Sequence, residues 1–272
     1  MATQLNDWLS IDKASGTGNA QITLTASSYG ELVDRAASLK IQAQSTNAIL
    51  NVRQKAYTPI EKNDNYFWVE FGGTNGTISG LTNDYTDMYH SFDGITWEKS
   101  PNTLSMGSNR LVYFKNNSKK ISERKKELTI SFNSNAKVGG DISSITDMAD
   151  SACQNLFYNN EYLTDASELI LPWNTLSQNC YSSMFEGCTS LTKAPVLPAT
   201  TLVKSCYIYM FWGCTNLNYV KMLATENTTK DNLFAWLSGV SSTGTFVKHP
   251  DANIPKGEDG IPRRWTVETA TE

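Results

Sequence analysis

Residues 179–191 read NCYSSMFEGCTSL, and the phrase returns at residues 205–217 as SCYIYMFWGCTNL, an interval of 26 residues. A worn third copy lies upstream and keeps the cysteine, phenylalanine and leucine positions, at Cys153, Phe157 and Leu163. A fixed period in the twenties is typical of a solenoid, in which each repeat covers the apolar side of its neighbour. The second half of the chain is therefore predicted to be a short stack of repeats.

Each repeat is expected to contain a short helix, a glycine turn and a short strand. Leu176, Cys180 and Met184 are spaced by four residues, which predicts one apolar stripe of a helix. Gly187 and Gly213 follow these stripes and suit a left-handed residue at the end of a helix. A leucine and a short extended run come next. Helices would then stack along one side and strands along the other.

The repeat phrase resembles the BspA-type leucine-rich repeats of gut Bacteroidetes and their phages. The resemblance is carried by CYxxMFxGCTxL at residues 180–191 and 206–217, and by LPATTL at residues 197–202. Members of this family are scaffolds with many different partners, so the resemblance implies a fold more than a function.

The C-terminal segment resembles the terminator of such arrays, on the evidence of residues 236–247 and 260–265. The resemblance implies a short α/β leucine-rich-repeat solenoid at residues 141–228 and a C-terminal cap at residues 229–272. Residues 231–236 have a helical pattern, and Trp265 is expected to pack on the final repeat.

The first 56 residues predict a small β-sandwich, because three alternating runs are separated by turn residues. The runs lie at residues 21–25, 37–43 and 48–54. The order of the segments at residues 8–11, 22–24, 35–37 and 52–54 resembles the BACON module, an immunoglobulin-like domain of Bacteroidetes proteins, and implies an Ig-like domain at residues 1–56. Residues 57–65 are polar and are expected to form a linker.

A second small β domain is predicted at residues 66–140. Its strands are expected at residues 66–71, 88–92, 96–98, 111–114 and 128–132. Asp93-Gly94 between two of these runs is a strong hairpin signal. The hairpin at residues 91–97 resembles the β domain that precedes BspA-type arrays, and the domain would cap the first repeat.

Composition excludes several classes of function. The 272 residues carry a formal net charge of −4, so no basic field is present to hold nucleic acid. No run of about 18 apolar residues occurs, so no membrane span is expected. The start, MATQLNDW, lacks the basic and apolar regions of an export signal. Either a signal was trimmed, or the protein is used where it is made, as a virion protein would be.

All five cysteines fall in the repeats, at Cys153, Cys180, Cys188, Cys206 and Cys214. Their spacing follows the repeat period, which favours small, buried, reduced core residues. Two alternatives stay open at this point: a disulfide between stacked repeats, such as Cys188 with Cys214, and a zinc site.

No recognisable catalytic motif occurs, and no catalytic, metal or cofactor-binding residue is predicted. Binding is the favoured class of function, and the candidate binding residues are aromatic side chains that replace small or polar partners between repeats: Trp173, Tyr209 and Trp212. Such rings are expected to face outward, where they can stack on sugars or anchor a protein. The alternative is burial against the C-terminal cap or a neighbouring subunit.

These expectations combine into a non-enzymatic virion protein of a Bacteroidetes phage, such as a head or tail fibre or a capsid decoration. Its partners would be other virion proteins, further copies of the chain in a homo-oligomer, and host glycans or mucin. A secreted or surface-anchored Bacteroidetes binding protein is the second reading, with localisation at the bacterial cell surface. A glycan-acting enzyme is the third.

Overall fold

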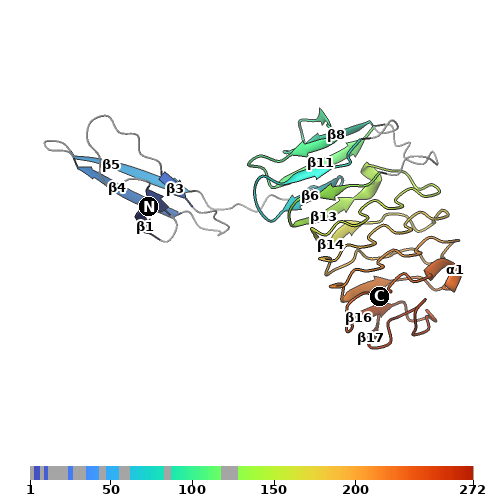
Figure 1. The fold of residues 1–272 in the computed structure, drawn as a ribbon. Coiled ribbons are helices and arrows are strands. Elements are labelled where there is room, and N and C mark those ends of the chain that lie inside the picture. Colours follow the sequence, from blue (N-terminus) through green and yellow to red (C-terminus); the bar gives the residue numbers. More distant parts are fainter. Residues whose placement is uncertain are drawn as a thin grey trace. The chain divides into compact units, whose positions relative to one another are not determined.

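A computed structural model of the chain describes residues 62–82, 87–117 and 128–271 in full, and the backbone of five strands before them. The chain divides into two compact units, Met1–Glu61 and Lys62–Glu272. The described elements are almost entirely β-strands and turns, with one short α-helix and one short 3-10 helix (Figure 1). The protein is therefore β-rich and has more than one unit, as the sequence predicted.

The first unit contains two antiparallel sheets, one of three strands in the order β1-β2-β3 and one formed by β4 and β5. The strands are β1 Thr3–Asn6, β2 Leu9–Ile11, β3 Leu24–Ala26, β4 Arg35–Gln42 and β5 Asn47–Gln54. Two predicted strands, at residues 37–43 and 48–54, match β4 and β5 closely. The prediction at residues 21–25 overlaps only the start of β3, and its first residues lie outside the described part.

The second unit begins with a six-stranded sheet in the order β14-β13-β6-β11-β8-β9, beside a small sheet in the order β10-β7-β12. The strands are β6 Phe67–Phe71, β7 Thr77–Ser79, β8 Met88–Ser91, β9 Glu98–Lys99, β10 Thr103–Ser105, β11 Leu111–Asn116, β12 Ser131–Phe132, β13 Ala136–Asp141 and β14 Leu163–Ile170. The predicted Asp93-Gly94 hairpin is confirmed, because β8 pairs with β9 antiparallel across it. The predicted strand at residues 128–132 is shorter than expected.

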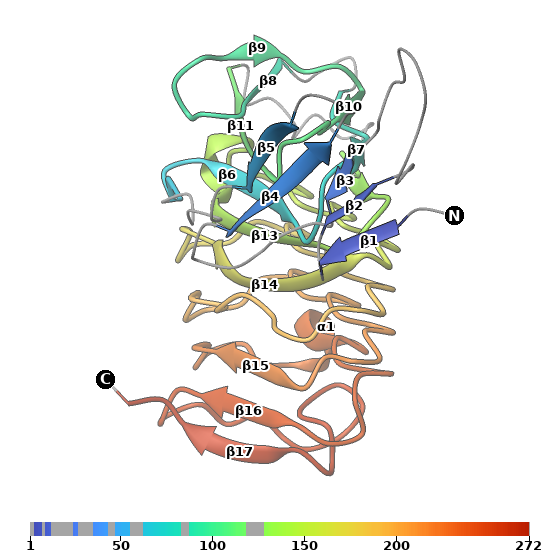
Figure 2. The ribbon, with the colours of Figure 1, turned by 90° about the vertical axis from the view of Figure 1, so that its left-hand side faces the viewer.

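A stack of coils continues from this sheet, and each coil adds one strand or one bridge to the same side (Figure 2). β13 pairs with β14 in parallel, and single parallel bridges join Asp165 to Lys193 and Lys193 to Tyr219. Three further parallel strands complete the stack: β15 Tyr219–Met222, β16 Thr245–Lys248 and β17 Thr266–Thr269. One hydrogen-bonded side thus runs from the hairpin region to the last strand.

The opposite side of each coil is a run of consecutive turns, and the predicted helix there is wrong. We call these the turn runs, at residues 151–159, 179–187, 205–213 and 231–239. In the second run, the amide of Met184 donates to Tyr181 three residues back, at 3.2 Å, whereas the amide of Phe185 donates to Met210 in the next coil, at 2.9 Å. Alternate amides therefore leave the coil, which an α-helix does not allow.

Left-handed residues at every fourth position explain why the turns do not become a helix. Asn179, Ser183 and Gly187 have φ of 55°, 55° and 73°. An L-residue with positive φ interrupts a right-handed helix. The predicted spacing of four between Cys180 and Met184 is real, but it comes from turns that repeat every four residues. Both side chains are fully buried, as the stripe required.

The core lies between the strand side and the turn side. The rings of Phe157, Phe185 and Phe211 stack along it, with centroids 5.3 Å and 5.4 Å apart. All five cysteines are free and buried, which agrees with their interpretation as reduced core residues. Cys188 and Cys214 each donate their thiol to a backbone carbonyl at 3.0 Å, so they do not face one another as a bonded pair.

The fourth turn run overlaps the only α-helix among the described residues, α1 Lys230–Leu233. This helix is shorter than the one predicted at residues 231–236. Trp236, which belongs to this run, points into the core, is fully buried and donates its indole N–H to the carbonyl of Gly260 at 3.0 Å. Trp265 is also buried and donates to Ser241 at 2.8 Å. The segment between β16 and β17 thus packs on the last coil.

Candidate binding surface

Three aromatic rings gather on the turn side of the third and fourth coils, and we call them the aromatic cluster: Tyr209, Trp212 and Phe234. The rings of Tyr209 and Trp212 meet edge to face with centroids 6.5 Å apart, and those of Tyr209 and Phe234 do so at 5.4 Å. Trp212 is 46% exposed. This side of the stack is the one that carries α1 in Figure 1. Two of the three predicted binding residues therefore lie together.

The turn geometry explains why these rings are at the surface. Met210 and Phe211 lie between Tyr209 and Trp212, and both are fully buried. The inward positions of this turn are therefore occupied, and the two flanking rings lie nearer the surface. Tyr209 itself has φ of 55°, at a place where the other turn runs have the small residues Asn155, Ser183 and Ala235. A bulky residue in the left-handed region costs on the order of 1–3 kcal/mol, and such strain is concentrated at functional sites.

A charged pair borders the cluster. The Nζ atom of Lys230 lies 5.2 Å from the ring centroid of Phe234, within the range of a cation–π contact. The same Nζ atom is 3.6 Å from the carboxylate of Asp259. The positive charge of Lys230 is therefore compensated by Asp259, while its contact with the Phe234 ring helps to fix that ring at one edge of the cluster.

The third predicted residue, Trp173, does not belong to the cluster. It is half-buried and packs against the main core. Its counterpart one repeat later, Ala199, is fully buried. A small counterpart therefore does not by itself indicate an outward position for Trp173. Sequence comparison missed Phe234, because the fourth coil lacks the cysteine and methionine that mark the second and third repeats.

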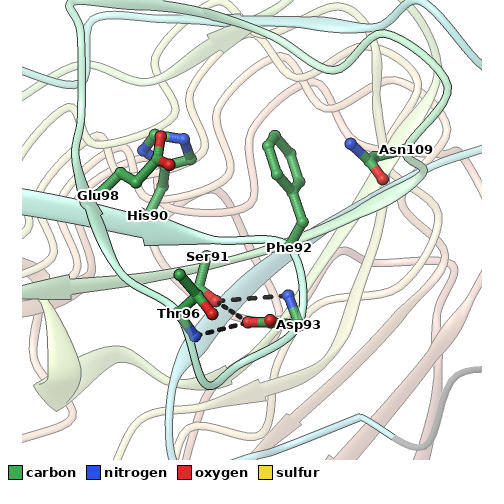
Figure 3. Close-up of a pocket in the computed structure, with 7 residues that line it drawn as sticks. All are labelled: His90, Ser91, Phe92, Asp93, Thr96, Glu98 and Asn109. Carbon is green, nitrogen blue, oxygen red and sulfur yellow. Dashed lines mark hydrogen bonds between the residues drawn. The ribbon is translucent and has the colours of Figure 1, made fainter.

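A hollow of about 470 Å³ lies at the β8–β9 hairpin and is lined partly by polar groups (Figure 3). The Ser91 hydroxyl donates to Asp93 Oδ1 at 2.8 Å, and the same oxygen accepts from the amides of Ile95 and Thr96 at 2.8 Å and 2.7 Å. These bonds hold the pKa of Asp93 far below its usual range, with the Thr96 amide contributing most. The carboxylate is therefore occupied in shaping the turn.

His90 lines the same hollow without forming a catalytic pair. Burial lowers the pKa of His90 and outweighs the opposing effect of Glu98. The hydroxyl of Ser100 lies beside the ring, with its Oγ 3.5 Å from Nδ1. That distance exceeds the reach at which a base activates a hydroxyl nucleophile. Ser91 is bonded to Asp93 instead, as the dashed lines in Figure 3 show, and this contact shapes the turn.

No protein-family model matches this chain, and neither does any curated protein or solved structure. In the described part of the chain, no helix is long and apolar enough to cross a membrane. Within residues 62–82, 87–117 and 128–271, no group of three His, Cys, Asp or Glu side chains is arranged to hold a metal ion.

Proposed function

We propose that the protein is a non-enzymatic adhesion component of a Bacteroidetes phage particle. In this proposal the stacked coils are a leucine-rich-repeat solenoid of the BspA type, and the first unit is an Ig-like module of the BACON type. One part of the chain attaches to the particle, and the coils present a surface to glycans of the host. A head fibre, a tail fibre and a capsid decoration all fit this role.

The observation that carries the binding function is the aromatic cluster. Exposed aromatic rings lose water at low cost and offer flat faces to sugars or to apolar groups of a protein. Tyr209 and Trp212 are held by backbone bonds that link neighbouring coils, at 3.1 Å from Tyr209 to Phe234 and 2.8 Å from Gly187 to Trp212. A preorganised surface of this kind loses little entropy when it binds.

The repeats resemble those of gut Bacteroidetes and their phages, and this resemblance supports glycans of the host as the partner. A surface-anchored Bacteroidetes protein that binds glycans would use the same rings, so the two readings differ in location and not in chemistry. Particle assembly distinguishes them. In the proposed role the chain co-purifies with intact virions, whereas its recovery only with bacterial outer membranes would rule the virion role out.

A glycan array tests the binding function with surface variants of the whole chain. Tyr209→Ala and Trp212→Ala are each expected to reduce binding to the recognised glycan, because each removes one ring of the cluster. The matched control is Tyr219→Ala, which removes a ring of similar exposure, 39%, from the strand side. Equal binding by all three variants and the parent would refute a role for the cluster.

A further inference from the structure

A row of side chains on the turn side extends the aromatic cluster to the first coil. Tyr158, Glu186 and Trp212 occupy the same place in three successive turn runs. The amide that follows each of the first two donates to the carbonyl of the next member, from Asn159 to Glu186 at 2.7 Å and from Gly187 to Trp212 at 2.8 Å. The three residues therefore form one line along the stacking direction.

The local backbone is the same at both ends of this row. The amide of Tyr158 donates to the carbonyl three residues back at 3.0 Å, and so does the amide of Trp212. Equal backbone geometry sends both rings out of the stack in the same direction. Tyr158 is 38% exposed and Trp212 is 46% exposed, so each has a ring surface open to a ligand.

The spacing of the row is set by hydrogen bonding between coils. Chains joined by such ladders lie about 4.8 Å apart, so Tyr158 and Trp212 are separated by about 10 Å, with Glu186 halfway. A ligand that touches both rings must therefore be extended along the stack. It must also repeat its apolar faces at that interval and offer hydrogen-bond donors between them.

An extended sugar polymer has these properties. Each pyranose unit has an apolar face of C–H groups that packs on an aromatic ring, and its hydroxyl groups donate to a carboxylate such as that of Glu186. The charge of Glu186 opposes a glycan that carries carboxylate or sulfate groups. Lys230, at the far end of the cluster, is already paired with Asp259.

We infer that an uncharged linear glycan binds along the stacking axis, across Tyr158, Glu186 and Trp212, and ends on the rings of Tyr209 and Phe234. This inference rests on the proposed adhesion function and specifies its ligand: a polymer recognised within the chain, over several sugar units, and not a single terminal sugar. Affinity therefore increases with the length of the oligosaccharide until the row is filled.

Affinity electrophoresis of the full chain tests this inference, in gels that contain a soluble cellulose derivative, linear mannan, linear xylan or anionic polygalacturonate. Calorimetry then follows oligosaccharides, from disaccharide to hexasaccharide, of the polymer that binds. We expect a neutral polymer to retard the chain, and Tyr158→Ala and Trp212→Ala each to weaken binding about three- to tenfold. The matched control, Tyr219→Ala, is expected to bind like the parent.

The variants separate this inference from the proposed function. If Trp212→Ala weakens binding and Tyr158→Ala does not, the row is overturned while glycan binding by the cluster stands. If the disaccharide binds as tightly as the hexasaccharide, the extended ligand is overturned. Preference for polygalacturonate contradicts the uncharged ligand. If no polymer retards the chain, or if all variants bind like the parent, both the inference and the glycan-binding function fail.

Discussion

Replacing Gly213 with alanine isolates the energetic cost of a left-handed residue in the turn runs. Gly213 has φ of +73°, and a Cβ atom there would lie 3.8 Å from Gly187 Cα, an ordinary contact. The left-handed conformation costs a residue with a side chain roughly 1–2 kcal/mol. Reduced freedom of the unfolded chain returns about 0.4–1 kcal/mol of this. The difference between this cost and this return predicts that the free energy of unfolding falls by about 1 kcal/mol.

Two matched variants show whether the backbone is the cause. Gly187 has the same φ of +73°, but a Cβ atom there would collide with the side-chain oxygen of Asn159. Gly187→Ala should therefore be more damaging than Gly213→Ala, by about another 1 kcal/mol or more, as expected for overpacking. Asn159 itself occupies the equivalent place in the first coil with φ of 54°. Gly213→Asn should therefore cost only a few tenths of a kcal/mol, because asparagine tolerates this region.

Thermal unfolding of the three variants beside the parent measures these differences. Circular dichroism follows loss of the strands, and tryptophan fluorescence, to which the buried Trp68, Trp236 and Trp265 contribute, follows loss of the core. A change of 1 kcal/mol corresponds to roughly 2–4 °C in Tm for a unit of this size. The expected order of stability is parent, Gly213→Asn, Gly213→Ala and Gly187→Ala. If Gly213→Ala unfolds at the parent's Tm, or if Gly187→Ala is the milder of the two alanine variants, the turn runs are not as described.

Further predictions concern the core, the last coil and the hairpin. Burial raises the pKa of Cys188 from 9.0 to about 12, so the folded state retains the proton, and the contribution of this thiol to stability should be constant below pH 9 and be lost as the pH rises toward 12. Urea titrations should show a shallower fall for Cys188→Ala. Trp265→Ala should lower the free energy of unfolding by about 3–5 kcal/mol, and Trp265→Phe by less, because it loses mainly the bond to Ser241. Asp93→Ala should accelerate hydrogen exchange at the Thr96 amide, whereas Asp93→Asn, which retains an acceptor oxygen, should change it little.

The repeat period predicted the stacking of coils but not the conformation of their turn side. Leu176, Cys180 and Met184 are buried as the stripe required, yet spacing by four is shared by helices and by successive four-residue turns. The distinguishing signal was present in the sequence. Asn179, Ser183 and Gly187 place small or polar residues at every fourth position, and such residues tolerate positive φ where a helix would favour other residue types.

The candidate site was predicted only in part for a similar reason. Tyr209 and Trp212 stood out because they replace small or polar residues in a well-preserved repeat. The alignment of Asn159 with Gly187, both suited to positive φ, places Tyr158 opposite Trp212, although Tyr158 was not among the predicted binding residues. Trp173 lies apart from the cluster and packs partly on the core, and its small counterpart does not distinguish an open surface from a tightly packed interior. Packing density depends on which residues of other coils surround a position, and the sequence of a single repeat does not contain that information.

The sharing of amides between turn runs has a consequence for how such a protein can change. The main-chain bonds that join one coil to the next depend on no particular outward side chain. Tyr158, Glu186 and Trp212 can differ completely while their amides and carbonyls keep the same partners. Selection can therefore change the residue at this place in each coil independently, while the main-chain bonds that join the coils keep the same donors and acceptors.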